Sequence, residues 1–172
     1  SERATRLSTF GRQWDAAEKA ARRWQSLETD SIEAAQFLAQ ALLRQGKAEE
    51  AANQYISIVK TSEDKEETLR EIQATVQGGG SADEIVSVMH RIQSAYPELV
   101  ESHLALARAL VRKGDNESAL TAADQAHKLD PNNTPAVLLK AETLMVLGRP
   151  DEGLKVADMA LAANPDNQQL RL

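Results

Sequence analysis

The sequence predicts an all-α fold, a solenoid of antiparallel helix pairs that repeats every 34 residues. Four glycines in similar local settings follow this spacing: Gly46, Gly80, Gly114 and Gly148. Three prolines follow it too: Pro97, Pro131 and Pro165. Only 3% of the residues are aromatic whereas 42% are hydrophobic, so Ala, Leu, Ile and Val must build the core. A period of this length suits two helices and two turns, with each pair burying its apolar face against the next pair.

The first complete pair shows why the glycines matter. Ser31 can cap a helix that begins near Ile32, and apolar residues then recur at helical spacing as far as Leu42. Gly46 interrupts a run of strong helix formers, where it would cost about 1 kcal/mol relative to alanine. We therefore expect Gly46 to form the turn between two helices, with the second helix beginning near Ala48.

Later units carry further boundary signals. The stretch from Ser81 to Glu84 is a capping box, which predicts a second helix that begins there. Pro150 follows Gly148 at a first-turn position, where its missing N–H costs nothing. Pro131 and Pro165 predict helix ends at the residues before them.

Three features occur together in this chain: the period of 34 residues, a glycine followed five residues later by alanine, and a closing proline. In these features the chain resembles the tetratricopeptide repeat. Segment 97–131 supplies the residues that match the family best: Leu106, Ala107, Gly114, Ala119, Ala126 and Pro131. The next unit has Gly153 where the family prefers alanine, and Gln73 and Ile85 occupy small-residue sites in 66–99. The family's first-helix Trp and Tyr are absent, so the repeats are divergent. The resemblance implies a right-handed superhelix.

The same spacing divides the whole chain, residues 1–172, into one solenoid. We expect a partial repeat and full repeats, followed by the start of a truncated repeat: 1–31, then 32–65, 66–99, 100–133 and 134–167, then 168–172. Trp14 lies where a second helix should begin, because Ala17 precedes Ala51 by one period. Both ends look truncated, as in a fragment of a longer array.

Composition excludes several function classes. A net charge of −6 and a pI of about 5.2 argue against nucleic acid as a partner, because phosphate binding needs a basic surface. The absence of cysteine excludes disulfides and thiolate metal sites but leaves the compartment open. No apolar run approaches the roughly 20 residues of a membrane span, so we expect no direct membrane insertion.

No residue pattern predicts catalysis. His90, His103 and His127 lack metal-ligand spacing and fall at three different repeat positions, so we expect no enzyme activity and no cofactor or metal. Gly78–Gly80 is not followed by the residues of a phosphate loop. It is interpreted as a shortened first helix and a flexible turn, and a hinge is the alternative.

The resemblance implies that the first helix of each pair lines a concave groove. The corresponding positions here are Gln36, Gln40, Leu43, Arg44, Arg70, Ala74, Gln77, Leu104, Arg108, Val111, Arg112, Leu138, Glu142, Met145 and Val146. The family's carboxylate-clamp set of Lys and Asn is absent. The groove instead offers arginines and apolar side chains, which suit peptide carbonyls, carboxylates and apolar partners. The alternative, that Leu104, Leu138 and Met145 pack on neighbouring helices, stays open.

We therefore predict a protein–protein interaction scaffold that binds a peptide segment or a partner protein on its concave face. The alternatives are a structural or self-associating spacer, or an accessory repeat region of a larger protein such as a protease adaptor. The stretch "WDAAEKAARRW" followed by "LAQALLRQGKAEEA" resembles the long tetratricopeptide lipoproteins of Gram-negative bacteria. That resemblance implies a periplasmic, outer-membrane-associated protein.

The C-terminal end predicts a second kind of partner. The last helix of the final pair is left partly uncovered, because the next helix stops at Leu172. Its apolar residues are Leu154, Val156, Ala157, Ala160 and Leu161. We expect two copies of the chain to form a homodimer through this uncapped end.

Overall fold

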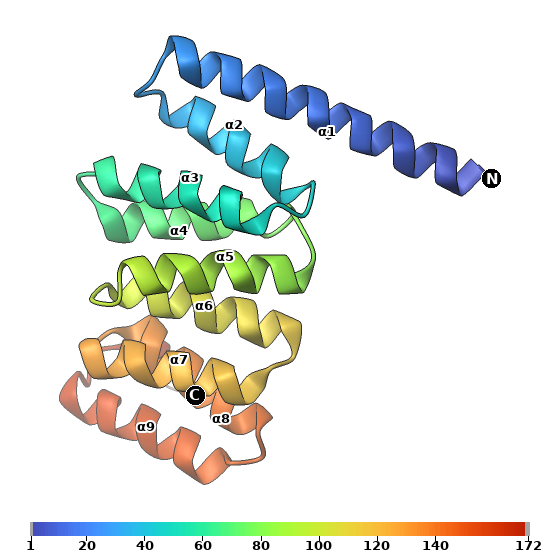
Figure 1. Ribbon diagram of the computed structural model, residues 1–172. Helices are drawn as coiled ribbons and strands as arrows, with labels where there is room; N and C mark the ends of the chain where they lie inside the picture. Colours follow the sequence, from blue (N-terminus) through green and yellow to red (C-terminus); the bar gives the residue numbers. More distant parts are fainter. Residues whose placement is uncertain (1, 171–172) are drawn as a thin grey trace. The chain divides into compact units, whose positions relative to one another are not determined.

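The computed structural model describes residues 2–170, and within them the chain forms nine α-helices, one short 3-10 helix and no strand (Figure 1). The α-helices are α1 Glu2–Leu27, α2 Ile32–Leu43, α3 Ala48–Thr61, α4 Lys65–Val76, α5 Ala82–Ala95, α6 Val100–Lys113, α7 Asn116–Leu129, α8 Thr134–Val146 and α9 Pro150–Ala163. The 3-10 helix η1 spans Gln168–Leu170. The predicted all-α fold class is confirmed. No described helix combines the length and apolar character that a membrane crossing needs.

The chain divides into two compact units, one ending at Ile92 and the other beginning at Gln93. We call them the N-terminal unit and the C-terminal unit. In the N-terminal unit, α2 packs on both α1 and α3, and α3 packs on α4. The Ser31 hydroxyl accepts a hydrogen bond from the Ala34 N–H at 3.2 Å, so Ser31 caps α2 as predicted.

The first helix differs from its prediction. Helix α1 runs without a break from Glu2 to Leu27, so the prediction that a helix begins at Trp14 is wrong. The upstream residues are mostly good helix formers, and no proline interrupts them. A single glycine, Gly11, costs about 1 kcal/mol, which is too little to stop a helix of 26 residues.

The four periodic glycines all lie between helices, but for two different reasons. Gly46, Gly114 and Gly148 have φ values of 77°, 87° and 74°, a left-handed conformation in which a side chain would be strained. Gly80 does not share that conformation. A Cβ atom there would lie 2.7 Å from a Glu84 carboxylate oxygen. The buried Leu43 side chain would lie 3.2 Å from the same atom, so glycine lets this turn pack closely on α2.

Close packing also explains the neighbouring Gly79, whose Cβ would lie 2.7 Å from Leu43 Cδ2. The predicted capping box comes next in the chain and is confirmed. Ser81 N–H donates to Glu84 Oε2 at 2.6 Å, and Glu84 N–H donates to Ser81 Oγ at 3.3 Å. Helix α4 has 12 residues, as many as α2 but fewer than the 14 of α6 and the 13 of α8, so it is shortened relative to the later first helices only.

The C-terminal unit is built on small residues. Helix α7 packs on α6 and α8, α6 also contacts α8, and α8 packs on α9. The buried face of α7 consists of Ala119, Ala122, Ala123 and Ala126. Gly153 brings α9 close to α8, because a Cβ atom there would lie 2.8 Å from the Ala141 carbonyl oxygen. This contact accounts for glycine at a position where the resembled family prefers alanine.

The proline signals are confirmed at both predicted ends. Helix α7 ends at Leu129 and α9 ends at Ala163, each two residues before a proline. Pro150 is the first residue of α9. The division of the chain into repeats of 34 residues stays a prediction, as does a hinge at Gly78–Gly80.

Candidate functional site

The first helices of the C-terminal unit, α6 and α8, lie in contact and expose apolar side chains at equivalent positions. Val111 on α6 and Met145 on α8 are separated by one period and are 38% and 37% exposed. Val146, next to Met145, is 65% exposed. Apolar side chains that two neighbouring helices expose together can form a contact for a partner, so these three residues are a candidate binding surface. We call Val111, Met145 and Val146 the α6/α8 surface.

Charged candidates flank this surface. Arg112 and Glu142 are exposed, and Leu138 is half-buried. Arg108 is engaged within its own helix, because its Nη1 lies 2.6 Å from Oε1 of Glu101, a carboxylate that is only 5% exposed. Sequence alone suggests that Arg108→Glu together with Arg112→Glu leaves the fold intact. The ion pair removes that expectation for Arg108, since the substitution would place a second carboxylate beside the buried Glu101.

The candidates of the N-terminal unit are more polar. Gln36 and Gln40 are half-buried, and Arg44 lies over the ring of Trp14 at 5.4 Å from the centroid. Arg70 is exposed and forms an ion pair with Glu67. The two remaining candidates of α4 and its C-terminal end, Ala74 and Gln77, are exposed as well.

Two candidate residues belong to the core. Leu43 is 1% exposed and contacts the Gly79–Gly80 turn. Leu104 is equally buried and packs with Ala126 and Ala136, so the alternative of packing on neighbouring helices holds for it. Neither side chain presents surface to a partner.

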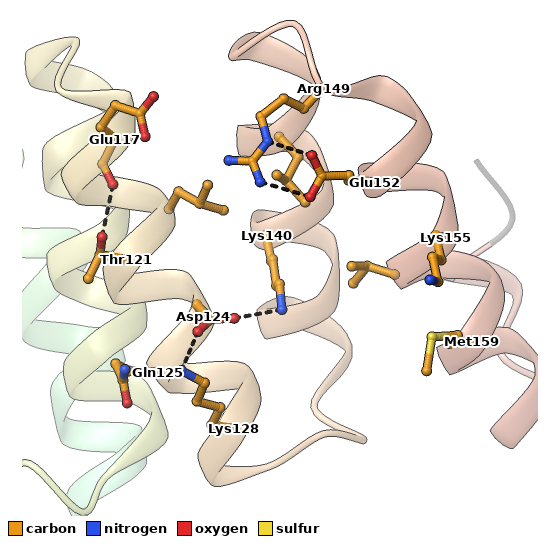
Figure 2. A pocket seen from close by; sticks show the side chains of 13 residues that line it. Glu117, Thr121, Asp124, Gln125, Lys128, Lys140, Arg149, Glu152, Lys155 and Met159 are labelled. Carbon is orange, nitrogen blue, oxygen red and sulfur yellow. Dashed lines mark hydrogen bonds and ion pairs between the residues drawn. The ribbon is translucent and has the colours of Figure 1, made fainter.

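A groove that the sequence did not predict lies between α7 and α9, with α8 as its floor (Figure 2). Its volume is about 590 Å³. The floor side chains Lys140 and Leu144 are two and six residues beyond Leu138, so they lie roughly 200° and 240° around α8 from it. The groove and the α6/α8 surface therefore use opposite faces of α8.

Ion pairs fill much of this groove. Asp124 accepts hydrogen bonds from Lys128 Nζ at 2.6 Å and Lys140 Nζ at 2.7 Å. Burial raises the pKa of Asp124, but the hydrogen bonds from the two lysines outweigh burial and leave the pKa below its ordinary value. Arg149 holds Glu152 with two bonds of 2.7 and 2.8 Å, which lower the pKa of Glu152.

The histidines do not form a reaction centre. His90 is exposed, and the buried His103 has Nε2 2.8 Å from the Pro97 carbonyl oxygen. Burial and the nearby Lys140 lower the pKa of His127, which favours the neutral ring. Among residues 2–170, no cluster of acidic and histidine side chains could hold a metal ion.

Comparison with protein families decides the identity of the fold. A model of the N-terminal tetratricopeptide repeat region of psidin matches residues 15–137, and a general tetratricopeptide repeat model matches residues 110–172. The chain belongs to the tetratricopeptide repeat family. Tetratricopeptide arrays are generally non-enzymatic scaffolds whose stacked helices form extended surfaces for protein partners.

Solved tetratricopeptide structures share this fold. YrrB, described as a tetratricopeptide protein with an unusual peptide-binding site, is 14% identical with a TM-score of 0.57, covering 97% of this chain and 86% of YrrB. A thermophilic tetratricopeptide protein from Thermus thermophilus is 23% identical with a TM-score of 0.52, covering 97% of this chain and 91% of that protein. MamA from Desulfovibrio magneticus is 13% identical with a TM-score of 0.57, covering 98% of each chain. No curated protein sequence matches the chain.

Proposed function

We propose that this tetratricopeptide array is a scaffold that binds a peptide segment or a partner protein through the predicted concave face, with the α6/α8 surface as its main contact. The observation that carries the proposal is the equal exposure of Val111 and Met145 at equivalent positions of two neighbouring first helices. A ligand that covers both side chains removes apolar area from water, which contributes about 25 cal/mol per Å² before the costs of association.

The polar neighbours suit a peptide. Arg112 lies beside Val111, and a guanidinium can donate two parallel hydrogen bonds to a carboxylate or can bind backbone carbonyls. The peptide-binding site ascribed to YrrB is a property of that protein, and it supports a peptide as the class of ligand here. The proposed mechanism is docking without a chemical step.

Site-specific photo-crosslinking in the full-length protein tests this function. A benzophenone amino acid replaces Val111 or Met145, and Leu129 on α7, a leucine that is also exposed, serves as the control position. We expect both first-helix positions to capture the same partner, identified by mass spectrometry, and the control position to capture none of it. Equal capture at all three positions, or no capture, contradicts the proposal.

Self-association is the second candidate function, and helix α9 favours it. Leu154 and Met159 of this helix are exposed, although Ala157 between them is buried. We propose that two copies pair through these side chains at high concentration. Light scattering over a concentration series should show a dimer that Leu154→Ser with Met159→Ser returns to a monomer. A monomer at millimolar concentration contradicts this pairing.

A further inference from the structure

The groove between α7 and α9 has the dimensions of a peptide site. Its α7 wall runs from Glu117 through Thr121 and Asp124 to Lys128. These eleven residue steps cover about 16 Å at 1.5 Å per residue. An extended chain rises about 3.3 Å per residue, so roughly five residues of an extended segment span the groove. The volume of about 590 Å³ lies within the usual range of ligand sites.

The two ends of the groove differ in charge. One end carries Glu117 and the ion pair of Arg149 with Glu152, and it has an excess of negative charge. The other end carries Lys128, Lys140 and Lys155 against the single carboxylate of Asp124. The second end therefore has an excess of two positive charges, although the whole chain carries −6.

Lys155 is the cation that a ligand can use. Asp124 already binds Lys128 and Lys140, whereas Lys155 is exposed and lies within 4 Å of no carboxylate among the described side chains. Its electrostatic neighbour is Glu152, three residues earlier on α9, and the hydrogen bonds of that carboxylate go to Arg149. Met159, one turn further along α9, is 66% exposed and lies at the same end of the groove, as Figure 2 shows. Charges beyond about 8 Å are screened at physiological salt, so these neighbours determine what the site attracts more than the net charge of the chain.

We propose that this groove is a second docking site, which takes an extended acidic peptide segment with one carboxylate at Lys155 and apolar side chains against Leu144, Val156 and Met159. Charge complementarity selects the occupant: a carboxylate gains a free ammonium partner, whereas a lysine would meet three cations. The groove lies on the face of α8 opposite to the α6/α8 surface, so the two sites bind independently and one scaffold can join two partners.

Fluorescence anisotropy with two labelled peptides tests the site. The probe is a hexapeptide of alternating leucine and glutamate, and the matched peptide has lysine in place of glutamate. We expect the acidic peptide to bind at least about tenfold more tightly than the basic one, with an affinity that falls as salt rises. Equal binding of both peptides, or no binding of the acidic peptide at millimolar concentration, overturns the proposal.

Matched variants locate the binding. Lys155→Glu should weaken the acidic peptide about tenfold, whereas Lys60→Glu, an equal charge change on α3, should alter it less than about twofold. Lys155→Gln should give an intermediate loss, and circular dichroism checks that each variant is folded. Val111→Ser with Arg112→Glu should leave binding of the acidic peptide unchanged. Failure of the α6/α8 proposal can therefore be distinguished from failure of the groove proposal. Wild-type affinity in Lys155→Glu overturns the assignment.

Discussion

The N-terminal and C-terminal units differ in where their ion pairs and their closest helix packing lie. In the N-terminal unit, Lys47 and Arg22 bind the same carboxylate, Glu18, at 2.7 and 2.8 Å, and Arg22 also binds Glu50 at 2.7 Å. This network joins α1 to α3 and to the turn before it. In the C-terminal unit, alanines and Gly153 bring backbones close together. Alanines are buried in the N-terminal unit as well, and Asp124 binds Lys140 between α7 and α8. The units therefore differ in their largest contact, which is an ionic network between α1 and α3 in the first and close backbone packing of α8 on α9 in the second.

The exposed surfaces differ in the same way. The candidate positions of α2 and α4 that reach solvent are mainly amides and arginines, whereas α6 and α8 expose Val111, Met145 and Val146. Apolar area supplies most of the affinity in protein interfaces, and arginine supplies specific polar contacts. We propose that the C-terminal unit holds the partner, because its exposed apolar candidates lie on two neighbouring first helices, although Phe37 on α2 is 61% exposed.

The largest expected effect is on close packing. Gly153→Val should lower the free energy of unfolding of the C-terminal unit by about 3 kcal/mol, because the new side chain meets the Ala141 carbonyl. Hydrogen exchange measured by mass spectrometry should speed up in α8 and α9 and stay unchanged in α2 and α3. Ala162→Val, at an exposed site on α9, is the control and should cost about 0.5 kcal/mol. Similar losses in both variants would mean that α9 has room to move.

The next effect concerns a charge in the C-terminal unit. Arg108→Glu should cost about 2 kcal/mol, because it places a second carboxylate beside the buried Glu101. Adding Glu101→Gln should recover about half of the loss, since the repulsion then disappears. Urea denaturation of the two single variants and the double variant gives the coupling energy. Additive losses would show that Arg108 does not neutralise Glu101.

A smaller, pH-dependent effect belongs to the N-terminal unit. Hydrogen bonds from Lys47 and Arg22 lower the pKa of Glu18 from 4.5 to about 2. A lowered folded-state pKa contributes stability above pH 4.5 that disappears as the pH falls from 4.5 towards 2. After allowance for solvent screening, Glu18→Gln should cost about 1 kcal/mol at pH 7.

Chemical denaturation over this pH range checks the prediction. The gap between wild type and Glu18→Gln should close as the pH approaches 2, whereas Glu63→Gln, at an exposed glutamate, should show little difference at any pH. If the difference in unfolding free energy stays constant with pH, Glu18 stabilises the fold through packing and not through its charge.

Local signals made much of the fold predictable. Ser31, the capping box at Ser81 and the prolines fix helix ends through contacts within a few residues, and the structure confirms them. The start of α1 differs from its prediction. The repeat period predicts where a helix should begin, but it does not show whether the residues before that point are helical too. The period predicts the place of Gly80 but not the full reason for it, since the contact of this turn with Leu43 depends on tertiary packing.

The site was less predictable than the fold. Repeat positions identify the first helices but not how deeply each side chain lies, so Leu43 and Leu104 were candidates although both are buried. The pair of Arg108 with Glu101 spans two helical turns, so the repeat position of Arg108 alone does not predict this contact. The groove was missed because its walls come from three helices, and no short motif joins Asp124, Lys140 and Lys155.

The α6/α8 surface can be tested with a variant that should change stability very little. Val111→Ser with Arg112→Glu alters two exposed side chains, so the midpoint of thermal unfolding should stay within about 2 °C of wild type. Isothermal titration calorimetry then measures binding of the partner captured through position 111. We expect at least about a tenfold loss of affinity in the double variant, with wild-type affinity in the control Leu129→Ser. Unchanged affinity in the double variant would contradict the assignment of the α6/α8 surface as the binding site.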